Sequence, residues 1–163
     1  MNIISNRSVN LPSSVSAIHV RQAQSEDLPG IASIEQLSFS DPWSEHELSA
    51  ILSLPHTIFL VSADHEGSVS GYAVVRSVSD EAEILNLAVS QSWRRAGLGG
   101  MLLDAAIGQA QSRGARAFFL EVRKSNTAAR SLYESRGFRQ LSIRKRYYRN
   151  PVEDALVLYR ETQ

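Results

Sequence analysis

The sequence predicts one α/β domain with a mixed β-sheet of about seven strands and helices on both faces. Short segments rich in aliphatic, β-branched and aromatic residues alternate with segments whose apolar residues recur at helical spacing. Their order is strand, two helices, three strands, helix, strand, helix and two strands, and no repeat, low-complexity tract or linker divides them. Helices on both faces of a mixed sheet are the simplest way to bury these apolar surfaces.

The domain is expected to span residues 18–163, preceded by a loose extension over residues 1–17. The extension carries serine, asparagine and proline but no acidic residue. It also lacks the apolar core of a secretory signal and any sustained periodicity, so no element is predicted in it.

Strand predictions rest on runs of β-forming residues between turn signals. Asp64–Gly67 separates two such runs and predicts a hairpin turn. The predicted strands cover residues 18–23, 57–63, 69–78, 81–89, 117–122, 138–143 and 155–159, with an Arg- and Tyr-rich connection before the last one.

Helix predictions rest on caps and stop signals. Ser25 is a candidate cap for a first helix with an apolar stripe, and Ser44 with Glu47 forms a capping box for a second helix. Later helices are predicted to end at Gly114 and at Gly137, because glycine is favoured directly after a helix C-terminus.

Composition excludes several functional classes. Lys plus Arg and Asp plus Glu both number 17 in a chain of 163 residues, so no basic field for direct nucleic-acid binding is expected. The chain has no cysteine, which fits a cytoplasmic location, and no apolar run approaches the roughly 20 residues of a membrane span. The four histidines show no ligand spacing, so no metal site is predicted.

A glycine-rich loop follows the strand that ends at Val89 and precedes an apolar-periodic helix. Its sequence runs Trp93-Arg94-Arg95-Ala96-Gly97-Leu98-Gly99-Gly100. A helix N-terminus with glycines is typical of a site for a phosphorylated ligand. Met101 excludes a nucleotide-triphosphate loop, which needs Lys-Ser or Lys-Thr here, and Leu102 excludes a dinucleotide fingerprint.

Several motifs in a fixed order resemble the GCN5-related N-acetyltransferases. The pattern Arg94-x-x-Gly97-x-Gly99 is similar to their coenzyme A pyrophosphate loop. Further matching blocks are Leu120-Glu121-Val122-Arg123-x-Ser125-Asn126-x-x-Ala129 and Leu132-Tyr133-Glu134-x-x-Gly137-Phe138. The motifs Asp41-Pro42-Trp43-Ser44-Glu45, Arg144-x-Arg146-Tyr147-Tyr148 and Glu153-Asp154-Ala155 resemble the ribosomal-protein alanine N-acetyltransferases of the RimI type.

This resemblance implies acetyl-CoA as co-substrate and assigns roles to matching positions. Glu121 matches the proton acceptor, acting directly or through a water, and Tyr133 matches the proton donor to the leaving thiolate. Asn126 is expected to bind the pantetheine amide. The main chain of Leu87, Ala88 and Val89 would hold the thioester, and the pyrophosphate would bind Arg94, Arg95, Ala96, Gly97, Leu98, Gly99 and Gly100.

The implied acceptor is the N-terminal alanine of small-subunit ribosomal protein number eighteen. An α-amine titrates near pH 8 and a lysine near pH 10, so a modest base such as Glu121 suits the α-amine (about two and a half powers of ten more neutral nucleophile). Trp43, Tyr147 and Tyr148 are candidate walls of a peptide slot.

Each candidate also has an alternative interpretation. Glu121 could be a strand-end carboxylate paired with Arg123 or another cation, Tyr133 a core tyrosine, Asn126 a helix cap and Trp43 a hydrophobic plug. The basic cluster Arg144, Lys145, Arg146 and Arg149 could be a solvated loop or could contact RNA or an acidic substrate.

Alternative functions keep the same cofactor residues. A member of the family could act on lysine side chains or on small-molecule amines, and a third possibility is a non-catalytic acyl-CoA-binding module. The sequence does not determine the oligomeric state.

Overall fold

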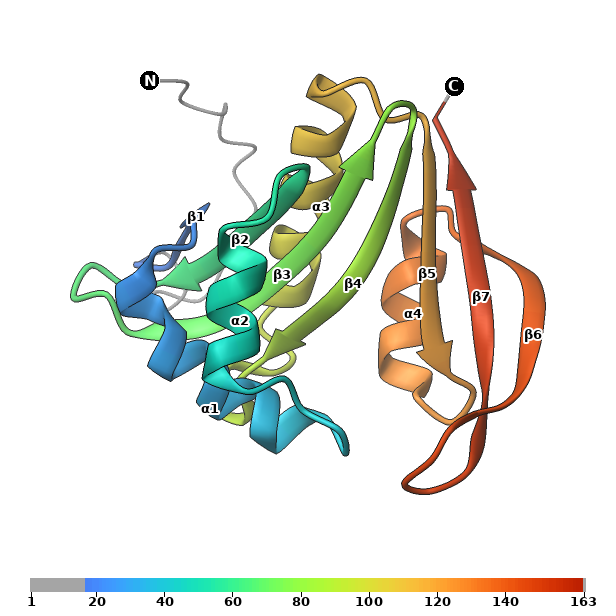
Figure 1. Cartoon of the computed structure of the whole chain (residues 1–163), viewed down its shortest axis with the longest axis horizontal. Helices are drawn as coiled ribbons and strands as arrows, with labels where there is room; N and C mark the ends of the chain where they lie inside the picture. The colour runs from blue at the N-terminus through green and yellow to red at the C-terminus, as the bar shows by residue number, and fades with distance from the viewer. Residues whose placement is uncertain (1–16, 163) are drawn as a thin grey trace.

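The computed structural model describes residues 17–162. All but the last residue of the predicted extension, 1–17, therefore lies outside the described residues. The strands are β1 (His19–Gln22), β2 (Thr57–Ala63), β3 (Val69–Val78), β4 (Glu81–Val89), β5 (Ala117–Arg123), β6 (Arg139–Tyr148) and β7 (Glu153–Glu161). They form one seven-stranded sheet in the order β1-β2-β3-β4-β5-β7-β6, which confirms the predicted fold class (Figure 1).

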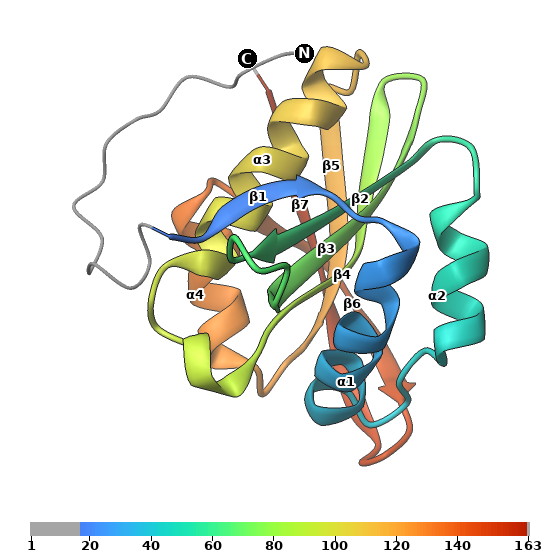
Figure 2. The same ribbon diagram turned by 90° about the vertical axis from the view of Figure 1, so that its left-hand side faces the viewer.

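Helices cover both faces of this sheet. The α-helices are α1 (Leu28–Ser38), α2 (Glu45–Leu52), α3 (Leu98–Ser112) and α4 (Thr127–Ser135), with the short 3-10 helices η1 (Ser25–Asp27) and η2 (Gln91–Trp93). Helices α3 and α4 lie on one face, and α1 and α2 lie on the other (Figure 2).

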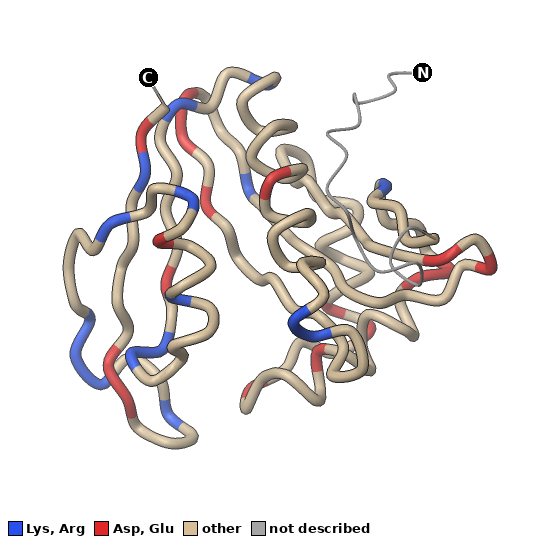
Figure 3. The backbone as a smooth tube through the Cα atoms, turned by 180° about the vertical axis from the view of Figure 1, so that it is seen from behind, with Lys and Arg blue, Asp and Glu red and all other residues tan. Residues whose placement is uncertain are grey.

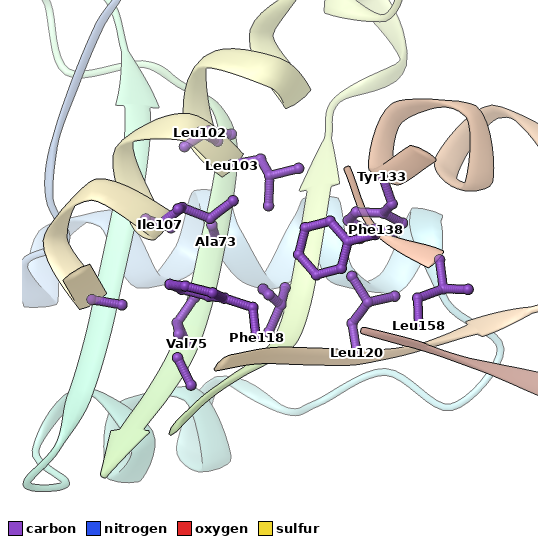
Figure 4. Packing of buried hydrophobic residues seen from close by; sticks show 14 of the residues in the cluster. Ala73, Val75, Leu102, Leu103, Ile107, Phe118, Leu120, Tyr133, Phe138 and Leu158 are labelled. Atoms are coloured by element: carbon purple, nitrogen blue, oxygen red, sulfur yellow. The ribbon is translucent and has the colours of Figure 1, made fainter. Parts of the chain in front are cut away.

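Hydrophobic clusters on the two faces explain why the central strands read as nearly continuous apolar runs. Successive strand residues point to opposite faces, and here both faces are covered, so both sets of side chains are buried. Ile31 and Leu48 cover one face against Phe59 and Val74. On the other face, Figure 4 shows Leu102, Leu103 and Ile107 of α3 and Tyr133 of α4 packed over the sheet. The strand side chains in the same cluster include Ala73, Val75, Leu120 and Leu158.

Strands β4 and β5 are parallel, but they pair over only part of their length. Their ladder runs from the Glu81–Ala117 pair to the Ile84–Leu120 pair, whereas β5 continues to pair with β7 as far as Arg123. Beyond Ile84 the two strands diverge (Figure 1). We call this opening the fork.

A bulge in β4 stands where the fork begins. Val74 of β3 pairs with Asn86, and the next residue, Val75, pairs with Ile84, so Leu85 is the extra residue. A bulge increases local twist and bends the strand that carries it. It therefore helps to direct the end of β4 away from β5.

Most predicted helix signals are confirmed. The Ser44 hydroxyl accepts a hydrogen bond from the Glu47 N–H at 3.2 Å, and the Glu47 carboxylate accepts one from the Ser44 N–H at 2.7 Å. Gly114 and Gly137 follow α3 and α4 with φ values of 101° and 82°. This left-handed region favours glycine.

The prediction of Ser25 as the first cap is wrong. Gln24 is the cap of η1, and the Asp27 carboxylate accepts the Gln24 main-chain N–H at 2.8 Å. The same carboxylate binds Arg21 at 2.7 Å, which fixes it on β1. The Asp27 carboxylate therefore satisfies the cap of η1 while Arg21 of β1 holds it, a contact that local sequence did not reveal.

The predicted connection before the last strand is also wrong in part. Residues 144–148 belong to β6, whose side chains are nearly all exposed. An edge strand with little burial needs no apolar alternation, so the pattern did not reveal it. The basic cluster therefore lies mostly on a strand, and Figure 3 shows it beside acidic residues that begin β7; Lys145 pairs with Asp154 at 3.1 Å.

Candidate active site at the fork

The glycine-rich loop has the backbone conformation of an anion-binding turn. Arg95 and Gly97 have φ values of 63° and 83°, and Gly97 is the N-terminal cap of α3. Left-handed residues within such a turn let successive main-chain N–H groups converge on one point. A non-glycine residue in this region costs on the order of 1 kcal/mol or more, so the strain at Arg95 is consistent with a ligand-binding loop.

A cavity of about 530 Å³ lies between this loop, the end of β4 and the start of α4. The predicted proton donor, Tyr133, lines it, as do the following predicted cofactor residues: Leu87, Ala88, Val89, Arg94, Arg95, Gly97, Leu98, Gly99 and Asn126. The structure thus brings the stretch from the end of β4 through the loop, together with the start of the distant helix α4, around a single cavity.

Ala96 and Gly100 do not line this cavity. Ala96 packs against a small cluster formed by Ile18 and Leu98. A Cβ at Gly100 would come within 2.3 Å of the Arg136 guanidinium. Gly100 therefore makes room for Arg136, which also binds Asp104 at 3.2 Å.

Sequence reasoning missed several residues that line the cavity. They are Ser38, Phe39, Trp93, Ala128, Ala129 and Leu132. Phe39 lies two residues before the Asp41-Pro42-Trp43 motif, and Leu132 directly precedes Tyr133, so both had a nearby signal. Phe39 brings the connection between α1 and α2 to the cavity.

The arrangement fits an extended thioester ligand with a phosphate end. Among the described residues, β4 has no strand partner on its β5 side beyond Ile84, so main-chain groups of that segment are available to a ligand. Gly99 lies close to Leu132, because a Cβ there would be 3.3 Å from a Leu132 methyl. The side chain of Asn126 caps α4 by accepting the Ala129 N–H at 3.1 Å, as the capping alternative expected.

Glu121 stands on β5, one residue past the last β4–β5 pair. Phe118, Leu120 and Val122 point into the cluster beneath α3, so Glu121 points to the opposite face. Its side chain is 21% exposed and its carboxylate binds Arg144 at 3.0 Å. The pKa of Tyr147 is raised, chiefly by its hydrogen bond to Glu121.

Arg123 is not the partner of Glu121. Its guanidinium binds Glu153 at 3.3 Å and the Ser40 hydroxyl at 2.8 Å, and it stacks on the Tyr148 ring at 4.3 Å from the ring centre. Arg123 therefore joins the end of β5 to the α1–α2 connection and to the β6–β7 hairpin. The cation-pair alternative for Glu121 is met by Arg144 instead.

Tyr133 lies on the face opposite to that of Glu121. Its side chain is 7% exposed, packs edge-on against Phe138 with ring centres 5.8 Å apart and lines the cavity. Burial raises its pKa to about 12, with a smaller contribution from Tyr148. The phenol therefore keeps its proton at neutral pH and can donate it.

The predicted slot residues occupy different environments. Trp43 is half-buried against the cluster beneath α1 and α2, which agrees with the plug alternative, and it does not line the cavity. Tyr147 is 46% exposed. Burial raises the pKa of Tyr148 to about 12, with Glu121 the next cause.

Comparison with known proteins identifies the family. Residues 28–138 match the Acetyltransferase (GNAT) family. The chain belongs to this family. It is 36% identical over 141 residues to the [ribosomal protein bS18]-alanine N-acetyltransferase of Escherichia coli strain K12, covering 85% of this chain and 94% of that protein.

Other relatives agree with this assignment. A putative [ribosomal protein bS18]-alanine N-acetyltransferase of Bacillus subtilis is 36% identical over 144 residues, covering 86% of this chain and 93% of that protein. The crystal structure of the ribosomal-protein-S18-alanine N-acetyltransferase from Escherichia coli aligns with a TM-score of 0.80 at 34% identity, covering 88% of this chain and 93% of that one. The protein is an acetyl-CoA-dependent N-acetyltransferase.

The described residues hold neither a cluster of metal-ligating side chains nor a membrane-spanning helix. Residues 17–162 contain no group of three or more His, Asp or Glu side chains arranged to hold a metal ion. Within the same residues, no helix has the length and apolar character that crossing a membrane requires.

Proposed function

We propose that this enzyme acetylates the α-amine of the N-terminal alanine of ribosomal protein bS18. The observation that carries the proposal is the 36% identity, over nearly the full length of both chains, to the Escherichia coli enzyme named for that reaction. We further propose that residues 18–163 form one domain and that the protein acts in the cytoplasm, which the absence of cysteine supports.

The fork supports the assignment of the base and the acid to opposite faces of the sheet. When bound, acetyl-CoA supplies the acetyl group as a thioester. We assign Glu121 as the base that takes a proton from the attacking amine, directly or through one water, and Tyr133 as the acid that gives its proton to the departing sulfur. A carbonyl placed in the fork is open to both faces, so the two groups can reach it without competing for the same side.

The remaining residues are assigned to binding. The main chain of Leu87, Ala88 and Val89 would donate hydrogen bonds to the carbonyl oxygen and the pantetheine. The glycine-rich loop would hold the pyrophosphate, with Asn126 close to the pantetheine. Tyr147 and Tyr148 would contact the acceptor peptide from the β6–β7 hairpin.

The test is acetyl transfer from labelled acetyl-CoA to short peptides. One peptide begins with a free alanine, and the matched control has a blocked α-amine and one free internal lysine. We expect label on the free N-terminus only. Label on the blocked peptide would contradict the α-amine assignment, and turnover of small amines with no peptide labelled would contradict the peptide acceptor.

A further inference from the structure

We call the α1–α2 connection, the end of β5 and the β6–β7 hairpin the acceptor side of the fork. Next to it lies a buried carboxylate that has no basic partner among the described residues. Glu35 on α1 is 1% exposed, and among the described residues it forms no ion pair. Burial raises its pKa, and the hydrogen bonds from Trp43 and Asn86 oppose that rise. An isolated buried acid is costly, and Leu48 and Ile34 show that the surroundings accept an aliphatic side chain.

The hydrogen bonds of Glu35 join segments that are distant in the sequence. One carboxylate oxygen accepts the Trp43 main-chain N–H at 3.0 Å. The Asn86 side-chain amide donates to the two oxygens at 3.0 and 3.2 Å. Glu35 therefore ties the end of the α1–α2 connection to β4, just after the bulge and one residue before Leu87 at the cavity.

The α1–α2 connection, residues 39–44, is held at both ends. Near its start, Phe39 lines the cavity and the Ser40 hydroxyl accepts a hydrogen bond from Arg123 at 2.8 Å. Near its end, the main chain of Trp43 is fixed only through Glu35 among the hydrogen bonds of the described residues. Without the Glu35 carboxylate, the Trp43 main chain would lose this hydrogen bond, and the segment would lose its polar link to Asn86 of β4.

We infer that Glu35 is a positioning residue for the acceptor, which fixes residues 39–44 against β4 so that Phe39 closes the acceptor side of the cavity. The inference rests on the proposed peptide acceptor. A residue that only stabilised the fold would not need these partners. The hydrogen bonds of Glu35 go specifically to the α1–α2 connection and to β4 at the edge of the fork.

The test compares Glu35→Leu with Glu35→Gln in the full chain. Leucine keeps the apolar packing but removes the hydrogen bonds from Trp43 and from Asn86. Glutamine keeps an acceptor for the Trp43 N–H, and its amide can pair with the Asn86 side-chain oxygen if that amide turns. We expect Glu35→Leu to raise KM for the alanine peptide about tenfold, with acetyl-CoA affinity nearly unchanged. Because the Trp43 N–H and the Asn86 amide lose their acceptor, the melting temperature should fall modestly. Glu35→Gln should stay within about threefold of the wild type.

Two results would overturn the inference. An unchanged peptide KM in Glu35→Leu would make the hydrogen bonds irrelevant to the acceptor. Equal losses of peptide and acetyl-CoA binding would indicate general damage to the fork. Asn86→Ala serves as the control for the β4 contact alone and should raise the peptide KM less than Glu35→Leu does.

A second measurement does not depend on turnover. In a Trp93→Phe background, acrylamide quenching reports Trp43, because the chain has two tryptophans. We expect Glu35→Leu to increase this quenching at least twofold, and equal quenching with and without Glu35 would overturn the inference. If the wild type labels no alanine peptide, the proposed acceptor fails while this measurement still decides whether Glu35 fixes the connection.

Discussion

The proposed cofactor side and the proposed acceptor side of the fork are built in different ways. The cofactor side comes largely from one continuous stretch, from β4 through the glycine-rich loop into α3, and offers mainly main-chain groups. The acceptor side combines the α1–α2 connection, the end of β5 and the β6–β7 hairpin. Side-chain contacts of Arg123 hold these three segments together. Glu35 in turn ties the α1–α2 connection to β4. Backbone changes should therefore affect the cofactor side, and side-chain changes the acceptor side.

The largest expected effect is at Glu121, where the two sides meet. Glu121→Gln keeps the shape of the side chain and removes its ability to accept a proton. We expect kcat to fall by about two to four orders of magnitude, the usual contribution of a general base. Acetyl-CoA binding, measured by calorimetry, should not change, and unaltered turnover would remove Glu121 from this role.

Tyr133 tests the chemistry on the opposite face. Tyr133→Phe keeps the buried ring and removes the proton, so we expect kcat to fall about ten- to a hundredfold with little change in acetyl-CoA affinity. Because its pKa is raised to about 12, the neutral, donating phenol is present below that value and is lost only as pH rises through it. A pH–rate profile of the wild type should therefore show no decline from Tyr133 between pH 7 and 10. A tyrosine-dependent decline in that window, absent from Tyr133→Phe, would contradict the assignment.

Arg123 tests whether side chains hold the acceptor side. Arg123→Met keeps the aliphatic length and removes the contacts with Ser40, Glu153 and the Tyr148 ring. We expect KM for the alanine peptide to rise about tenfold while the acetyl-CoA affinity stays within about twofold. Arg123→Lys should recover little, since the point charge of an ammonium group cannot reproduce the contacts of a planar guanidinium. If Arg123→Met weakened only acetyl-CoA binding, Arg123 would belong to the cofactor side and the assignment of its contacts to the acceptor side would be wrong.

Gly97 tests the main chain of the cofactor side. Gly97→Ala places a Cβ on a residue with φ of 83°, which costs about 1–2 kcal/mol if the backbone is kept. We expect acetyl-CoA affinity to fall several-fold, with the peptide KM unchanged at saturating acetyl-CoA. Gly67→Ala is the matched control, because Gly67 has φ of 88°, open space around its Cβ position and a place in the β2–β3 turn. It should lower the melting temperature similarly and leave acetyl-CoA affinity alone; equal affinity losses in both variants would show that the loop conformation has no special role.

Local sequence was enough to predict several backbone features at and around the candidate site. The loop pattern, the capping box at Ser44 and the stop signals at Gly114 and Gly137 depend on neighbours within a few residues. These signals can be read from the sequence alone, because local sterics and local hydrogen bonds decide the main-chain conformation. The roles of Glu121 and Tyr133 stay predictions that came from matching motifs.

Other features had no signature in the sequence. The strand from Arg144 to Tyr148 lies at an exposed edge, so its residues carry no apolar alternation. Arg123 and Glu121 share a face of β5 and could have paired, yet Arg123 reaches Glu153 and Ser40. Glu35 sits in an apolar helix stripe, where nothing local distinguishes a functional acid from a solvated one.

The sequence by itself determined the alternation of strands and helices, the left-handed glycines and the loop that begins α3. Only the tertiary structure decided which charges pair, how far β4 and β5 stay together and which segments meet at the cavity. The physical reason is range: caps, turns and periodicity act over a few residues, whereas ion pairs and buried hydrogen bonds join groups that approach only once the sheet has formed, such as Glu35 and Asn86.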